Sequence, residues 1–296
     1  MLAFCLAAAV APTAVRAADV PNVLAQRDRT IAGGRVVQVI VPQWQITTTI
    51  DIGRVAGDAD SGGGGLLGAI VLSSLDDKRK ALSRASFDRA EATIAPLRKA
   101  LQGFDVDAMA LATSKAALAK PAWFQPSSVE LSKSRSLDVP TAESAQAAMI
   151  TYRYETSPDF TQIRVIAEIE LRLAGAKPGG KPVRDPSYRQ QVSSIVLLRE
   201  PSFEPAENVA KWSAGDGKLA KAALTSAFGR LEQLIPFALD LSESDLKAFT
   251  SKGREKAFAA GYYGPLIERR ADRLGETLIW KDGLVNVQPS AAATGD

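Results

Sequence analysis

The chain of 296 residues contains no histidine, and its single cysteine is Cys5. The lack of histidine excludes a Ser-His-Asp triad, a Cys-His pair and a histidine-ligated zinc. A single cysteine also excludes an intrachain disulfide, a CxxC redox centre and a cysteine-ligated cluster. The remaining catalytic options use a Ser-Lys pair, carboxylates, tyrosine, arginine or a hard metal. A group titrating near neutrality would have to be a perturbed carboxylate or lysine.

The charge of the chain is close to balanced. It carries 36 basic and 33 acidic residues, a formal net charge of +3. Nucleic-acid binding requires a basic stripe or patch, so we expect no nucleic-acid partner. The hydrophobic content of 46% is ordinary, and a chain of this length buries roughly three quarters of its unfolded surface, enough to fold without disulfides.

The first residues predict export. Residues 2–15 form an apolar run of about 14 residues, shorter than the roughly 20 that span a bilayer. Ala17 ends a small-residue cleavage pattern, which predicts a signal peptide over residues 1–17 and a periplasmic or secreted protein. No lysine or arginine precedes the run, and the alternative is a buried N-terminal helix. Phe4, directly before Cys5, argues against a lipidated cysteine.

The rest of the chain predicts an α+β fold. We expect an antiparallel sheet of about five to seven strands, with helices packed on one face and a helical hairpin inserted near residues 62–120. The clearest strand is 162–173, where apolar and charged residues alternate, as in a sheet covered on one side. We predict one domain over residues 18–288 and a loose tail over 289–296. A domain split near residue 120 is the alternative.

Several helices and turns follow from local signals. Ile94 and Leu97 belong to a stripe of helical spacing, with Pro96 expected to kink or end the helix. Ser242 and Asp245 have the spacing of a capping box. Further signals predict a helix capped by Asp105, a helix over 206–239 broken near Gly215 and Gly217, strands over 35–41 and 44–52, and a hairpin over 277–288.

No motif assigns a catalytic, cofactor-binding or metal-ligating residue. Ser244 and Lys247 have the Ser-x-x-Lys spacing, but the partner motifs of penicillin-binding families are absent. Asp58 begins a segment like a calcium loop, yet Ala69 stands where a bidentate glutamate is needed. We therefore expect no cofactor and no metal.

Two carboxylates on one strand face, Glu168 and Glu170, have two interpretations. Arg164 and Arg172 lie on the same face of the predicted strand, which favours charge pairing on a solvated surface. A catalytic pair would instead need one carboxyl group with a raised pKa in a cleft.

A glycine-rich segment is the most unusual local feature. It contains one Gly-x-x-x-Gly spacing within a short apolar stretch, a pattern that permits close helix contact. A hinge that opens a core helix, a contact surface for a helix or subunit, and shallow membrane insertion are the alternatives. The residues concerned are Gly64, Leu67, Gly68 and Val71.

Two aromatic clusters are the other candidate surfaces. One contains Trp123 and Phe124 between two prolines, and the other contains Tyr262 and Tyr263 between two glycines. Each could line a ligand pocket or present an interaction surface, and each could equally be a packed turn beside the sheet.

These observations favour an exported, non-catalytic protein that binds a protein partner, a second copy of itself or a small ligand. The alternative is a hydrolase or transferase that uses carboxylate or tyrosine chemistry. An enzyme should show a deep pocket in which at least two ionisable side chains converge. A binding module should show an exposed apolar patch.

Overall fold

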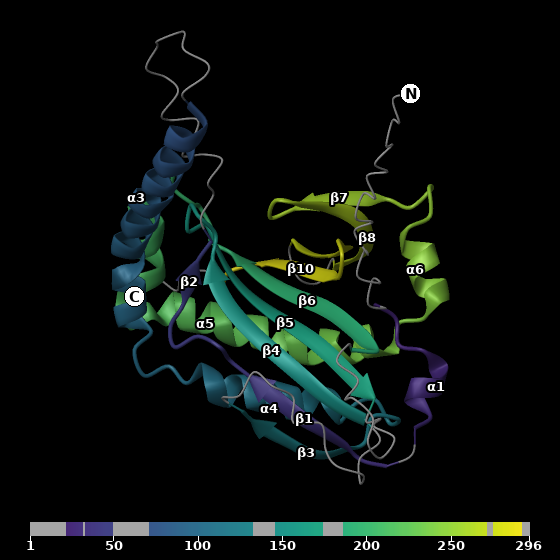
Figure 1. The fold of residues 1–296 in the computed structure, drawn as a ribbon. Helices are drawn as coiled ribbons and strands as arrows, with labels where there is room; N and C mark the ends of the chain where they lie inside the picture. The colour runs from purple at the N-terminus through teal and green to yellow at the C-terminus, as the bar shows by residue number, and fades with distance from the viewer. Residues whose placement is uncertain are drawn as a thin grey trace, which may run out of the picture.

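The computed structural model describes residues 22–31, 33–49, 71–132, 146–173, 186–270 and 275–291. These residues form one ten-stranded mixed sheet with helices (Figure 1), which confirms the α+β class. The strands are β1 (Arg35–Ile40), β2 (Thr47–Thr48), β3 (Pro126–Leu131), β4 (Gln146–Thr156), β5 (Gln162–Leu173), β6 (Tyr188–Leu197), β7 (Lys256–Ala259), β8 (Tyr262–Arg270), β9 (Glu276–Trp280) and β10 (Leu284–Pro289).

The sheet has the order β3-β1-β4-β5-β6-β10-β9-β8-β7, with β2 paired to β4. Our expectation of five to seven antiparallel strands was wrong in number and in direction. β1 runs parallel to both β3 and β4, and β10 runs parallel to β6. Parallel neighbours need a long crossover, which here contains helices. Alternation of apolar residues reports which face is covered, and it carries no information on strand direction.

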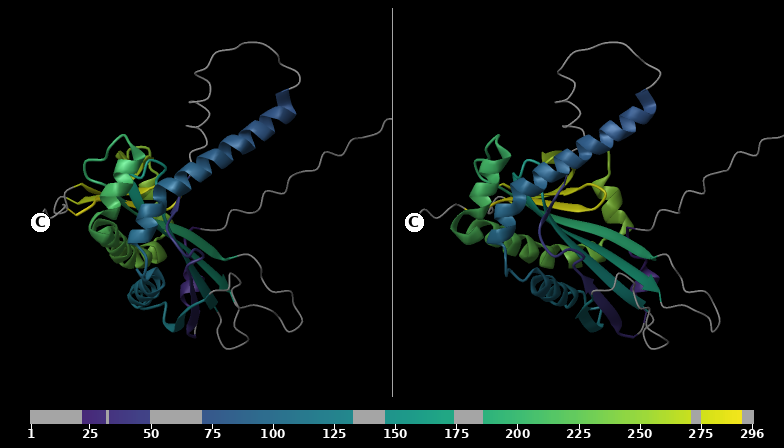
Figure 2. Two further views of the ribbon diagram at one scale, coloured as in Figure 1. Left: turned by 90° about the vertical axis from the view of Figure 1, so that its left-hand side faces the viewer. Right: turned by 60° about the vertical axis from the view of Figure 1, so that its left-hand side comes forward.

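The described helices are α1 (Gln26–Arg29), α3 (Val71–Ala100), α4 (Val106–Leu118), α5 (Pro205–Asp240) and α6 (Glu243–Phe249). α4 and α5 cover one face of the sheet, as expected (Figure 1). α3 packs against α5 and extends beyond the sheet (Figure 2). No helix in the described ranges combines the length and the apolarity needed to cross a membrane.

The main core lies between this helical layer and the sheet. Ile163, Val165 and Ile169 of β5 point toward the helices and are fully buried. Opposite them, α5 contributes an apolar stripe that includes Leu224 and Leu231. The alternation in residues 162–173 thus predicted both the strand and its buried face.

A second, smaller core lies on the opposite face of the sheet. Strands β8 and β7 curl over this face, and Ala257 and Leu266 pack on Ile195 and Val287. This curl brings the β7–β8 hairpin, residues 256–270, above the outer face of the central strands (Figure 1).

Local signals placed several elements correctly. The Asp105 side chain accepts a hydrogen bond from the backbone N–H of Ala108 at 2.9 Å and caps α4. Ser242 and Asp245 form both halves of the capping box of α6. The expected C-terminal hairpin is β9–β10, and β10 extends through Pro289.

Other local expectations were wrong. α3 does not end at Pro96 and continues to Ala100, because a proline removes one hydrogen bond of a helix that tertiary packing can still hold. Of the strand expected over 44–52, only Thr47–Thr48 is a strand among the described residues, which end here at Thr49. Ile46 is buried while Trp44 is 87% exposed, so the two do not share a covered face.

The predicted break in α5 is confirmed, and α3 packs closely against α5 at this point. Gly215, Asp216 and Gly217 all have positive φ within the span of the helix. A Cβ atom on Gly217 would lie 3.1 Å from the carbonyl oxygen of Ala100. The glycine therefore allows the end of α3 to pack closely against α5.

Candidate functional site

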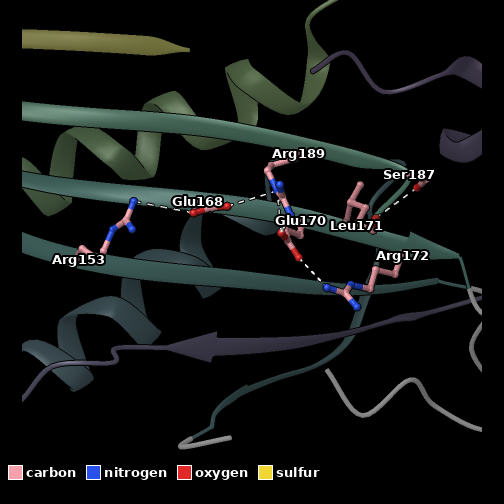
Figure 3. Close-up of polar contacts among 7 residues, drawn as sticks. All are labelled: Arg153, Glu168, Glu170, Leu171, Arg172, Ser187 and Arg189. Atoms are coloured by element: carbon pink, nitrogen blue, oxygen red, sulfur yellow. Dashed lines mark hydrogen bonds and ion pairs between the residues drawn. The ribbon is translucent and has the colours of Figure 1, made fainter. Parts of the chain in front are cut away.

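The two carboxylates of β5, Glu168 and Glu170, belong to a network of ion pairs on the outer face of the sheet (Figure 3). Glu170 is only 4% exposed and pairs with Arg172 at 3.0 Å and with Arg189 of β6. Glu168 pairs with Arg189 at 3.3 Å and with Arg153 of β4 at 3.9 Å. Both carboxylates are compensated by arginine across strands, as the charge-pairing interpretation expects. The expected solvated surface is wrong for Glu170, which is buried, and Arg164 bonds to Gln162 rather than to either carboxylate.

The first aromatic cluster, Trp123 and Phe124, holds several elements of the fold together. Phe124 is fully buried, and the indole Nε1 of Trp123 donates to Asp240 at the end of α5 at 2.8 Å. The Trp123 ring lies between the guanidinium groups of Arg29 and Arg35, at 5.6 and 5.1 Å from its centroid. These contacts tie α1, β1 and α5 together and leave Phe124 without an accessible surface.

The second aromatic cluster forms the tip of the β7–β8 hairpin. Ala260 and Gly261 connect the strands with φ values of +53° and +84°, as in the two-residue turn that suits a twisted hairpin. Gly264 is required for the packing of β8, because a Cβ atom there would lie 2.1 Å from the carbonyl oxygen of Trp280.

The two tyrosines of this hairpin point to opposite faces. Tyr262 is half-buried beside the second core, and its ring lies under the guanidinium of Arg164 at 5.6 Å. Tyr263 is 59% exposed and lies directly opposite Phe258, which is 73% exposed. Lys256 approaches the Tyr263 ring, with Nζ 5.7 Å from its centroid. The outward face of the hairpin thus carries an aromatic pair and a cation.

β7 is also an end strand of the sheet. The backbone N–H of Leu266 donates to the carbonyl of Glu255 at 2.8 Å, so Glu255 and Leu266 are a hydrogen-bonded pair. In an antiparallel hairpin, hydrogen-bonded and non-hydrogen-bonded pairs alternate along the strands. By that alternation, the N–H and C=O groups of Lys256 and Phe258 point away from β8. Among the described strands none pairs with this edge. The signal in the sequence is the Ala260-Gly261 pair, whose positive φ values suit a hairpin turn.

Near Tyr262, one carboxyl group has a perturbed pKa. Burial raises the pKa of Glu155 above its usual value, and the opposing charges of Arg164 and Arg153 offset part of that effect. Glu155 lies opposite Arg164 in the register of β4 and β5. The Tyr262 hydroxyl approaches Arg164, at 3.5 Å, and no described contact joins it to a carboxylate. The geometry thus does not bring a tyrosine and a buried carboxylate together here.

A buried ion pair joins β9, the neighbour of β8, to α5. Glu276 is 1% exposed, forms an ion pair with Arg230 at 2.7 Å and accepts a hydrogen bond from Asn286 at 2.9 Å. With Arg199 and Gln288 it lines a cavity of about 370 Å³ between α5 and β10. Two ionisable side chains meet this cavity, and the carboxylate among them is already bonded to an arginine.

The remaining sequence candidates carry no site in the described structure. Gly64, Leu67 and Gly68 lie outside the described residues, and Val71 begins α3, with its side chain also outside them. The Ser244 hydroxyl contacts that of Ser242 at 2.7 Å, and Lys247 is exposed on α6. Over the described ranges, no group of three His, Cys, Asp or Glu residues could hold a metal ion.

Comparisons with known proteins give no family. No protein-family model, no curated protein and no solved structure matches this chain.

Proposed function

We propose that the chain is an exported, non-catalytic binding protein whose partner is an extended segment of another protein. The segment adds as a strand to the free edge of β7 and packs on the outward aromatic pair of the hairpin. The observation that carries the proposal is the exposure of Phe258 and Tyr263 side by side on an end strand. Main-chain pairing at an open edge supplies affinity, and side-chain contacts supply selectivity.

The chemistry of this edge suits a specific partner better than indiscriminate aggregation. β7 has four residues and carries Lys256, and both short length and lysine protect an edge strand from self-pairing. Aromatic residues are enriched at the centres of protein interfaces, where they contribute most of the binding energy. Export is the expectation from residues 1–17, and it would place this edge among envelope or secreted partners.

The test uses residues 18–296 with a tag and captures partners from an envelope extract, with and without detergent. Three variants are compared with the parent: Phe258→Pro, Phe258→Ser and Phe203→Ser. Phe258→Pro removes the ring and also an N–H that points away from β8, a change that an edge strand tolerates. Phe258→Ser removes the ring and keeps the N–H. Phe203 is fully exposed in the β6–α5 connection, so it is the matched control for losing an exposed aromatic.

The proposal expects one stoichiometric protein that the parent and Phe203→Ser recover and both Phe258 variants lose, with unchanged unfolding midpoints. Equal recovery by Phe258→Pro would exclude strand addition. If the parent forms dimers and both Phe258 variants abolish them, the partner is a second copy of the chain, and the proposal is overturned. Recovery of nothing, together with turnover in a broad hydrolase screen, would favour the alternative enzyme.

A further inference from the structure

A cavity on the helix-covered side of the sheet is independent of the β7–β8 edge. It has a volume of about 420 Å³ and lies among the β1–β2 connection, the end of α3, the α3–α4 turn and α5. Volumes of roughly 300–1,000 Å³ are typical of small-molecule sites. The residues that matter here are Trp44, Arg98, Lys99, Phe104, Tyr154 and Leu224.

Tyr154 lines this cavity, and its hydroxyl makes no hydrogen bond with a described residue. The side chain is 95% buried in the core yet lines this cavity. Burial and the nearby charge of Asp107 raise the pKa of Tyr154 to about 12, so the hydroxyl remains protonated. Tyr152, two residues earlier on the same strand face, bonds instead to Ser114 at 3.0 Å. The hydroxyl of Tyr154 therefore remains available to a polar group of a ligand in the cavity.

The mouth of the cavity carries one uncompensated positive charge. The guanidinium of Arg98 is held by Glu91 in two hydrogen bonds and by the carbonyl of Ile46 at 3.0 Å. Lys99 is exposed, and it makes no ion pair or hydrogen bond with any described residue. No acidic residue lines the cavity. Asp107 lies near Tyr154, so an anionic group is favoured at Lys99 and disfavoured at the tyrosine end.

The remaining lining suits a flat apolar ring. Trp44 is 87% exposed at the rim, Phe104 is half-buried, and Leu224 closes the floor. We propose that this cavity binds a small aromatic carboxylate, with its ring against Trp44 and Phe104. The carboxylate contacts Lys99, and a polar group at the other end of the ring bonds to the Tyr154 hydroxyl.

The test measures dissociation constants by titration calorimetry on residues 18–296. The probes are 2-naphthoate, its neutral analogue 2-naphthamide and 6-hydroxy-2-naphthoate. Lys99→Gln is compared with Lys115→Gln, an exposed lysine of α4 outside the cavity. Tyr154→Phe is compared with Tyr152→Phe, which removes a hydroxyl that does not reach the cavity.

In the parent, we expect naphthoate to bind about fivefold to tenfold more tightly than naphthamide, and Lys99→Gln to abolish that difference. 6-Hydroxy-2-naphthoate should bind more tightly than 2-naphthoate by a similar factor. Tyr154→Phe should remove this gain, whereas Lys115→Gln and Tyr152→Phe should retain it. Phe258→Ser should leave all three constants unchanged, because the hairpin lies outside the cavity.

Failure of naphthoate to bind, or equal binding of acid and amide, would overturn the assignment of an anionic aromatic ligand. If Tyr154→Phe keeps the affinity gain from the ligand hydroxyl, as Tyr152→Phe should, then Tyr154 does not bond to the ligand, and its role is overturned. Loss of naphthoate binding in Phe258→Ser would place the ligand on the hairpin instead. Each of these results is separate from the outcome of the partner capture.

Discussion

At the scale of the residue, Arg35 shows how a buried charge is satisfied without an acidic partner. Its side chain is 1% exposed. The guanidinium donates to Gln146 Oε1 at 2.5 Å, to the carbonyls of Trp123 and Phe124 at 2.8 and 2.6 Å, and to that of Asp28 at 3.2 Å. One side chain thus bonds α1, β4 and the α4–β3 turn to β1.

Replacing Arg35 with methionine keeps much of the volume and leaves these acceptors unpaired. Since each unsatisfied buried acceptor costs about 1–3 kcal/mol, we expect Arg35→Met to lower the free energy of unfolding by about 3 kcal/mol or more. Urea unfolding measures the change. Arg89→Met, at an exposed position on α3, is the control and should stay within about 0.5 kcal/mol of the parent. A loss below about 1 kcal/mol in Arg35→Met would contradict this account.

Two glycines differ in why they are glycine: Gly264 is required by a close contact, whereas Gly229 has open space around it and only lowers the helix propensity of α5. Gly264→Ala places a Cβ atom 2.1 Å from the Trp280 carbonyl oxygen, whereas nothing lies within 4 Å of a Cβ atom on Gly229 in α5. We expect Gly264→Ala to destabilise the protein and Gly229→Ala to stabilise it by about 0.5–1 kcal/mol. Thermal unfolding of both variants tests the opposite signs. A stable Gly264→Ala protein would mean that β8 does not pack this closely on β9.

At the scale of the element, the capping box of α6 gives a pH-dependent prediction. Hydrogen bonds from the Ser242 hydroxyl and backbone N–H lower the pKa of Asp245 below its usual value. A folded-state pKa that is lowered adds stability above the unfolded value, and this stability is lost as the pH falls through the folded value. The effect of Asp245→Asn on unfolding should therefore be present at pH 7 and fade in acid.

Urea unfolding of the parent and Asp245→Asn at pH 7 and near pH 3 measures that difference. Ser242→Ala, which removes the cap itself, should cost about 1 kcal/mol at pH 7. Glu243→Gln in the same turn is the control, because its carboxylate is exposed and takes no part in the box. A penalty for Asp245→Asn that is equal at both pH values would exclude the charged cap.

The elements also show what the sequence could predict. Capping residues such as Asp105, alternation along residues 162–173 and the turn before Leu284 depend on near neighbours, and each was placed correctly. β3 and the parallel pairing of β1 depend on partners about 90 residues away, which no local pattern encodes. Tyr263 was a candidate from its neighbours, but its exposure opposite Phe258 required the register of the hairpin.

The Tyr154 cavity could not be predicted from local sequence for the same reason. Tyr154 is one of several apolar residues on an alternating strand, and its pattern matches that of Tyr152. Only the packing of Phe104 from the α3–α4 turn and Leu224 from α5 distinguishes a tyrosine that lines a cavity from one that meets Ser114.

At the scale of the whole molecule, one sheet joins strands from both sides of residue 120. We therefore expect a single unfolding transition, in which far-UV circular dichroism and tryptophan fluorescence have the same midpoint. Trp123, Trp212 and Trp280 report from three parts of the structure, through the α4–β3 turn, α5 and β9. Two separate transitions would support a domain boundary near residue 120. A reducing agent should not change the midpoint, because the chain cannot form an internal disulfide.

The position of β10 has a consequence for when the protein can fold. The last strand of the chain lies between β6 and β9, so it alone joins β3-β1-β4-β5-β6 to β9-β8-β7. Until residues 284–289 have left the ribosome, the sheet remains two separate pieces with open inner edges. Contacts between residues so distant in the chain also close slowly. A nascent chain built in this order cannot complete the sheet until the last described strand has been synthesised.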